Sequence, residues 1–191
     1  MLATAAMRRA CTRTLCASPR VMRPTSQPTL SFDPSAKTAM DKQEPPAPGA
    51  DFRVVIVGAG NINFGSDEGP WNHSFRLEHK LGPRLKVVAL IDPDAERARR
   101  VLKTKCQSFV LSAYKDTVVY PTFKDYMASV CAETYPHAVW VGSPPAFRGG
   151  TEPGRNLEQL LTAGLPNVPL FIEKPVSTGA VDQTFEVAKM L

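Results

Sequence analysis

The residues whose types could do chemistry lie where apolar runs end. The first group is Gly58-Ala59-Gly60, directly after the apolar run Arg53–Val57. Glycine lets a turn bend sharply and approach a phosphate, and the amides of the next helical turn can then bind the anion. The usual spacing is G-x-G-x-x-G, but Asn63 stands at the third glycine position. A plain glycine turn at the end of a core strand therefore stays open as an alternative.

Asp92 is the second such residue, and it follows the apolar run Lys86–Ile91. In a dinucleotide-binding fold, an acid at this position accepts hydrogen bonds from the adenosine ribose. A carboxylate there repels a 2′-phosphate, which favours NAD over NADP, but the nearby Arg97 and Arg99 keep NADP open. Asp92 is also a candidate N-cap of the next helix, with Pro93 at its first position, and the two roles are compatible.

Two further segments follow apolar runs in the second half of the chain. The turn 142–145 (Gly-Ser-Pro-Pro) follows Ala138–Val141, and the triplet 173–175 (Glu-Lys-Pro) follows Val168–Ile172. Open parallel sheets bind ligands at the edge where their strands end. A lysine there can give a proton to a substrate hydroxyl or polarise a carbonyl, and a neighbouring glutamate can orient it. A simple turn and a solvated Glu-Lys pair are the alternatives.

The segments that must position these residues alternate between strand and helix signals. Apolar runs predict strands at 53–57, 86–91, 138–141 and 168–172, with a short one at 118–120. Helical patterns lie at 75–81, 94–106, 122–135 and 154–163, and from Val181 onward. This alternation predicts an α/β fold of the Rossmann type, a doubly wound parallel sheet with helices on both faces.

The first fifty residues have a different composition from the rest. They hold seven of the 18 prolines and no hydrophobic periodicity, so we expect a disordered leader at 1–50 and one domain at 51–191. Residues 1–32 are rich in arginine and contain no acid, which is typical of a mitochondrial transit peptide. An untranslated extension before Met40 is the other interpretation. We expect a cytoplasmic protein, with the mitochondrial matrix as the alternative.

Charge and hydropathy exclude several classes of protein. Most of the formal net charge of +5 lies in the leader, and the domain shows no basic stripe of the kind that binds nucleic acid. No apolar run reaches the eighteen residues of a membrane-spanning helix. The cysteines form no C-x-x-C pair, and no metal site is expected. The expected partners are a dinucleotide and a small molecule.

In this order and spacing, the motifs resemble the nucleotide-binding half of the Gfo/Idh/MocA family, which includes glucose–fructose oxidoreductase and inositol dehydrogenase. The resemblance covers residues 52–191, and the Glu-Lys-Pro triplet is its most specific element. It implies NAD or NADP as cofactor and hydride transfer between nicotinamide and a sugar- or polyol-type carbon. Lys174 and Glu173 are the implied catalytic residues. The implied cofactor contacts are Gly58, Gly60, Asn61, Ile62, Asp92, Ser143, Pro144 and Pro145.

Two features depart from the family pattern. Many members carry a histidine shortly after the turn that matches Pro144 and Pro145, whereas Arg148 stands in that region here. Members also continue into a second α/β domain that supplies most of the substrate pocket, and this sequence stops at Leu191 without it. A non-catalytic dinucleotide-binding or sensor protein, or a truncated relic of an enzyme, is therefore the alternative to an oxidoreductase. A methyltransferase-like domain is a third possibility, in which Glu-Lys-Pro has no role.

Overall fold

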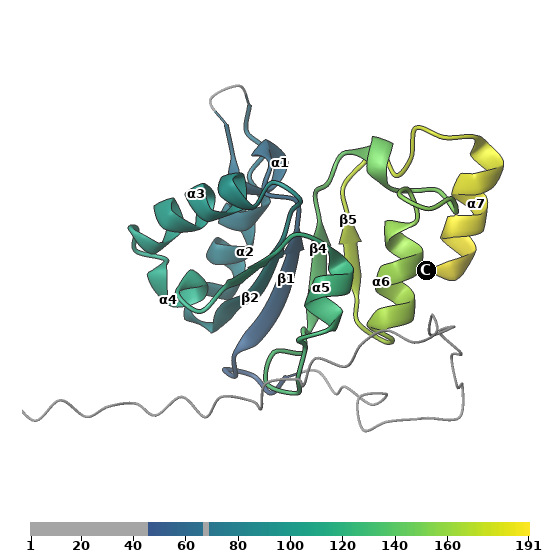
Figure 1. The fold of residues 1–191 in the computed structure, drawn as a ribbon. Helices are drawn as coiled ribbons and strands as arrows, with labels where there is room; N and C mark the ends of the chain where they lie inside the picture. Colours follow the sequence, from purple (N-terminus) through teal and green to yellow (C-terminus); the bar gives the residue numbers. More distant parts are fainter. Residues whose placement is uncertain (1–45, 67–68) are drawn as a thin grey trace, which may run out of the picture. The chain divides into compact units, whose positions relative to one another are not determined.

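A five-stranded parallel sheet forms the centre of the computed structural model, which describes residues 46–66 and 69–191. The strands, in order across the sheet, are β3 (Val118–Tyr120), β2 (Leu85–Ile91), β1 (Phe52–Val57), β4 (Ala138–Val141) and β5 (Leu170–Ile172). All four pairings are parallel, so every strand ends at the same edge of the sheet (Figure 1). The predicted leader falls almost wholly outside the described residues.

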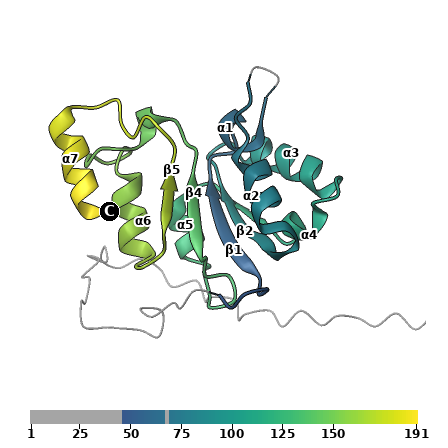
Figure 2. The same cartoon turned by 180° about the vertical axis from the view of Figure 1, so that it is seen from behind.

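Helices cover both faces of this sheet (Figures 1 and 2). One face packs against α2 (His73–Leu81), α3 (Ala95–Cys106) and α4 (Leu111–Tyr114). The other face packs against α5 (Phe123–Met127) and α6 (Leu157–Gly164). The remaining helices are α1 (Asn61–Phe64), α7 (Val181–Met190) and the 3₁₀ turns Gly82–Arg84 and Pro145–Phe147.

The central strands β1 and β2 are largely apolar and contribute to two separate cores. Val54 and Ile56 on β1 pack under α2, α3 and α4, whereas Val55 and Val57 pack under α5 and α6. Successive side chains on a strand point to opposite faces, so one buried strand serves both layers. This arrangement confirms the predicted doubly wound sheet.

The expected helix over 122–135 is wrong beyond Met127. Thr122 caps α5 as predicted, because its side chain accepts a hydrogen bond from the Asp125 amide. The helix then stops where the Ser129 hydroxyl donates to the Tyr126 carbonyl at 3.0 Å. Side-chain hydroxyls that bond nearby carbonyls compete with the helical pattern. Apolar spacing alone could not reveal this competition.

Other helix ends differ by a few residues. The α2 helix begins two residues earlier than expected because the Asn72 side chain caps it and accepts from the Phe75 amide. The α6 helix begins at Leu157 rather than at 154. Neither α1 nor α4 was expected, because a four-residue helix is too short to show a period. None of the helices in the described part of the chain combines the length and apolarity that a membrane crossing requires.

Candidate functional site

The glycine turn lies where the ends of β1, β2 and β4 meet. Gly58 has φ +95°, a left-handed backbone that strongly favours glycine. A Cβ at Gly58 would lie 3.0 Å from the Ser143 amide nitrogen, so a side chain would push the turn away from β4. The Gly58 amide also donates to the Ile91 carbonyl at 2.8 Å. The turn is therefore fixed against both neighbouring strands.

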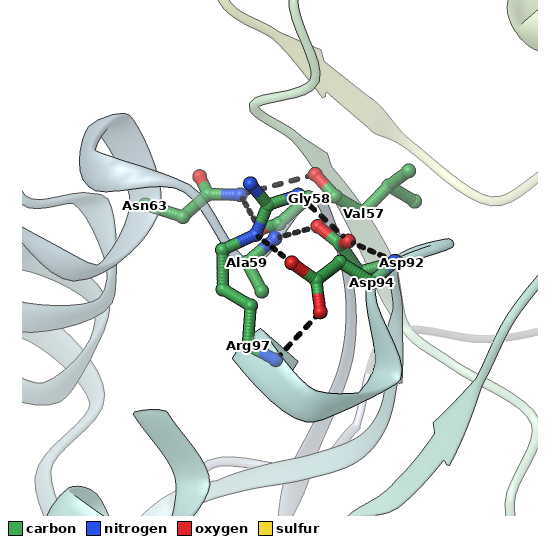
Figure 3. Close-up of polar contacts among 7 residues, drawn as sticks. All are labelled: Val57, Gly58, Ala59, Asn63, Asp92, Asp94 and Arg97. Carbon is green, nitrogen blue, oxygen red and sulfur yellow. Dashed lines mark hydrogen bonds and ion pairs between the residues drawn. The ribbon is translucent and has the colours of Figure 1, made fainter. Parts of the chain in front are cut away.

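Asp92 reaches across from the end of β2 and holds this turn (Figure 3). Its side chain is buried, and Oδ2 accepts a hydrogen bond from the Ala59 amide at 2.6 Å. Oδ1 accepts from the Asp94 amide at 2.8 Å and from the Arg97 guanidinium at 2.9 Å. The bond to Asp92 raises the pKa of the Arg97 guanidinium. The carboxylate thus faces the glycine turn, at the edge where a dinucleotide would bind.

The helix-cap interpretation of Asp92 is wrong, because Asp94 is the N-cap of α3. The Asp94 side chain accepts a hydrogen bond from the Arg97 amide at 2.9 Å. That bond holds the pKa of the Asp94 carboxyl below its ordinary value. The cap falls two residues later than the sequence suggested, which leaves Asp92 free for the glycine turn.

Asn63, which stands at the third glycine position of the usual motif, makes hydrogen bonds that hold the glycine turn. Its side chain is buried, and Nδ2 donates to the Gly58 carbonyl at 2.7 Å and to the Val57 carbonyl at 3.0 Å (Figure 3). A Cβ at Gly142 would clash with the Asn63 side-chain amide. Asn63 therefore ties the turn to β1 and packs against the end of β4, where the sequence showed only a lost motif position.

The geometry beside the turn fits an anionic group such as a pyrophosphate. The first amides of any helix lack partners within the helix, and in α1 these belong to Asn61 and Ile62. No atom of the described residues lies within 4 Å of a Cβ built at Gly60, so these residues leave the backbone there open to close approach. The longer helix expected after the turn begins only at His73. The helical amides nearest the glycine turn are therefore those of the single turn of α1.

Arg148 braces the other half of the site. Its guanidinium is buried, with Nε donating to the Ser143 carbonyl and Nη1 to the Val176 carbonyl, each at 2.8 Å. Nη2 donates to the carbonyl of Glu173. Burial lowers the pKa of Arg148, and the Glu158 carboxylate, 3.9 Å away and also buried, opposes that shift. Arg148 thus fastens the 143–145 turn to the Glu-Lys-Pro segment.

His73 is a site residue that the sequence did not reveal. Its Nε2 lies 2.6 Å from Oε2 of Glu173, and its Nδ1 lies 3.2 Å from the Arg76 guanidinium. Arginine can only donate, so Nδ1 is the acceptor and Nε2–H donates to the carboxylate. The ring packs against Trp140 and Phe171, with centroids 5.6 and 5.1 Å away. The helix cap Asn72 was the one local hint, because it places His73 at the start of α2.

Lys174 is exposed, and its ammonium lies over an aromatic ring. The distance from Nζ to the centroid of the Trp71 ring is 5.8 Å. In the described part of the chain, no ion pair includes Lys174. The Glu173 side chain bonds His73 instead. The sequence suggested that the glutamate would orient the lysine directly, whereas in the structure the two side chains have separate partners.

The fold and the site together define a dinucleotide-binding domain of the Rossmann type. The chain belongs to the Gfo/Idh/MocA family, because the family model described as "Oxidoreductase family, NAD-binding Rossmann fold" matches residues 52–191. This match confirms the resemblance, the fold and the class of cofactor that the sequence indicated.

Two fission yeast proteins (Schizosaccharomyces pombe strain 972) are similar to this chain. Uncharacterized protein C12C2.04 is 43% identical over 145 residues, which cover 75% of this chain and 38% of that protein. Uncharacterized protein UNK4.17 is 41% identical over 152 residues, which cover 78% of this chain and 37% of that protein. The chain thus matches less than two fifths of the length of either relative.

Two solved structures share the fold. The WlbA dehydrogenase from Chromobacterium violaceum, in complex with NADH and UDP-GlcNAcA, is 17% identical with a TM-score of 0.51. The match covers 78% of this chain and 34% of that one. A super-repressor mutant of Gal80p from Saccharomyces cerevisiae is 18% identical with a TM-score of 0.51, over 74% of this chain and 31% of that one. The likeness supports the fold alone, since one neighbour is a dehydrogenase and the other a repressor.

Proposed function

We propose that this chain is the NAD(H)-binding domain of an oxidoreductase that transfers a hydride between nicotinamide and a sugar- or polyol-type CH–OH group. The observation that supports it is the convergence of Gly58, Asp92 and Lys174 at one edge of the sheet, at the ends of β1, β2 and β5. The family model supplies the reaction class. The WlbA neighbour, with its bound NADH and nucleotide sugar, agrees with this substrate class.

In this proposal the glycine turn and Asp92 hold the adenosine half of the cofactor. The amides of Gly60, Asn61 and Ile62 bind the pyrophosphate. A carboxylate offers about four acceptor sites. Asp92 uses three of them, for Ala59, Asp94 and Arg97, which leaves one for a ribose hydroxyl.

NADP remains the alternative cofactor. The Arg97 side chain is 45% exposed beside Asp92 and carries the charge that a 2′-phosphate would need. Comparing the affinities of the two dinucleotides for the same protein decides between them. We expect tighter binding of NADH, because the Asp92 carboxylate lies against the turn and repels a 2′-phosphate.

In this proposal Ser143, Pro144 and Pro145 would hold the nicotinamide end, with Glu173 and Lys174 beside them. The bound cofactor supplies the hydride chemistry. Lys174 gives or takes the proton of the substrate hydroxyl, since its ammonium is exposed and has no carboxylate partner in the described residues. Arg148 keeps the two loops at a fixed separation while substrate and cofactor bind.

The test is an NADH titration followed by a turnover assay on the full-length protein that carries this sequence. Quenching of tryptophan fluorescence measures NADH affinity, and absorbance at 340 nm measures hydride transfer across a panel of sugars and polyols. Lys174→Ala should retain NADH affinity and lose turnover. Lys189→Ala is the matched control, because Lys189 pairs with Glu186 on α7 at 2.6 Å.

The outcomes separate the alternatives. Failure to bind either dinucleotide overturns the proposal. Tight NADH binding without turnover on any substrate supports a non-catalytic sensor, and tighter binding of S-adenosylmethionine supports a methyltransferase-like domain. A cytoplasmic location, with the mitochondrial matrix as the alternative, is part of the proposal, and fractionation of the tagged protein tests it.

A further inference from the structure

We infer that Trp71 and His73, the two residues that flank the cap Asn72 at the start of α2, position Lys174 by keeping the two charges of the Glu-Lys pair apart. We call residues 71–73 the α2 junction. This inference rests on the proposed function, in which Lys174 exchanges the proton with the substrate. It assigns positioning roles to Trp71, His73 and Glu173 and leaves Lys174 as the catalytic residue.

The first contact of the α2 junction, from His73, keeps the Glu173 carboxylate away from Lys174. Glu173 and His73 have side chains only 12% and 4% exposed, and the Nε2–H donates at 2.6 Å. Trp140 and Phe171, stacked with ring centroids 3.9 Å apart, lie against the imidazole. In such a poorly hydrated setting a charge-assisted hydrogen bond is strong. Glu173 therefore stays on His73 and does not turn to its neighbour Lys174.

The second contact gives the ammonium a different partner. Trp71 offers its ring face to Lys174 at 5.8 Å, within the range of a cation–π attraction. The indole is itself located, because a Cβ on Gly69 would clash with it, which means that the ring packs directly on the Gly69 backbone. The ring is 44% exposed, so the lysine can bind it and still face solvent or a substrate.

The two contacts together have a chemical consequence. A carboxylate paired with an ammonium holds the proton on the lysine and hides the charge. An indole attracts the ammonium more weakly and accepts no proton. Lys174 can therefore exchange a proton with a substrate hydroxyl without first breaking an ion pair. The glutamate next to it acts on its position only, through the bond to His73.

The reactivity of Lys174 toward acetic anhydride tests this inference. The reagent attacks the uncharged amine, so the rate of acetylation at a fixed pH, read by peptide mass spectrometry, reports how well the ammonium is stabilised. Trp71→Ala should raise the Lys174 rate about two- to fivefold, the effect of losing one exposed cation–π contact. Trp71→Phe keeps a ring and should stay near the native rate. Lys86 and Lys189 in the same digests serve as internal controls.

His73→Ala should change the rate in the opposite direction. It frees the Glu173 carboxylate to pair with Lys174, and we expect acetylation to slow about threefold or more. His73→Gln retains an N–H donor and should keep the native rate. The double variant His73→Ala with Glu173→Gln removes the freed charge and should abolish the slowing. Far-ultraviolet circular dichroism shows which variants are folded.

Two results would overturn the inference: unchanged Lys174 rates in folded Trp71→Ala and His73→Ala, or equal changes at Lys174 and the control lysines. The assay needs no cofactor and no turnover. NADH titration of the same variants is read separately. Suppose that the protein fails to bind NADH, but Lys174 acetylation is faster in Trp71→Ala and slower in His73→Ala. This result would refute the proposed function and still support the role of the α2 junction.

Discussion

The Asp92 carboxylate accepts a hydrogen bond from the Ala59 backbone amide at 2.6 Å, which joins the end of β2 to the turn after β1. The bond is buried, and the same carboxylate is paired with Arg97. One acid thus shapes the glycine turn and is also the residue that the proposed function assigns to the ribose. The position of Asp92 in the sequence motif suggests only the ribose role and not the bond to the glycine turn.

Replacement of Asp92 should therefore damage stability and cofactor binding together. We expect Asp92→Ala to lower the free energy of unfolding by about 2 kcal/mol and to weaken NADH binding about tenfold or more, because it removes three hydrogen bonds to one charged acceptor. Urea unfolding and NADH titration measure the two effects. Asp94→Ala is the matched control, because it removes the α3 cap and lowers stability while leaving NADH affinity unchanged. Equal losses of affinity in both variants would contradict this role.

Asn63→Gly restores the third glycine of the usual motif, and we expect it to be harmful. The variant loses two buried hydrogen bonds to the carbonyls of Val57 and Gly58. Unfolding free energy should fall by about 1–2 kcal/mol, and NADH should bind more weakly because the turn is looser. Asn61→Ala, at an exposed position of the same helix, should change stability by less than about 0.5 kcal/mol. Tighter NADH binding by Asn63→Gly would refute the assigned role.

Arg148→Met should unfold far more easily than the native chain. It leaves three carbonyls and the buried Glu158 without their cation, and we expect a loss of about 3–5 kcal/mol. Arg148→Lys should recover little, because an ammonium cannot reproduce the planar arrangement of donors. Adding Glu158→Gln to Arg148→Met should return part of the loss. Urea unfolding of the four proteins measures this, and full stability of Arg148→Lys would show that charge alone suffices.

His137 should make the domain less stable in mild acid. Its Nδ1 accepts a hydrogen bond from the Arg53 amide at 2.9 Å, and burial, with the Arg53 charge, holds its pKa below the ordinary value of 6.5. The unfolded chain then binds a proton before the folded one does. The stabilisation is therefore present above pH 6.5 and is lost as the pH falls below it.

The measurement is urea unfolding between pH 7.5 and pH 5. His137→Gln should show a smaller loss of stability over this range than the native protein. The exposed His79 on α2 gives the control variant, His79→Gln, which should follow the native curve. If His137→Gln loses as much stability between pH 7.5 and pH 5 as the native protein, other groups cause the loss.

The fold could be predicted because its signals are local. Each apolar run became a strand, and the cap Thr122 marked the start of α5 correctly. The end of α5 could not be predicted, because the apolar spacing continues to Thr134 while the helix ends at Met127, two residues before the Ser129 hydroxyl bonds the Tyr126 carbonyl. Apolar spacing registers packing faces and not such side-chain competition.

The sequence motifs predicted several residues of the candidate site, but they did not predict the long-range contacts between its side chains. Gly58 and Asp92 were recognisable because a turn and a strand end restrict the residue type. His73 and Glu173 are 100 positions apart, and only the parallel pairing of β1, β4 and β5 brings their elements together. Arg148 stood where many family members carry a histidine, and its neighbours in sequence do not show that the carbonyls of Glu173 and Val176, 25 and 28 positions away, bind its guanidinium.

The Arg148 brace bonds main-chain oxygens at Ser143, Glu173 and Val176. Main-chain oxygens are the same for every amino acid, so the brace does not depend on which side chains these positions carry. Residues on the two loops can therefore be exchanged, by evolution or by a protein engineer, while the spacing between the loops persists. In the proposed oxidoreductase, such a scaffold allows a new substrate preference without loss of its architecture.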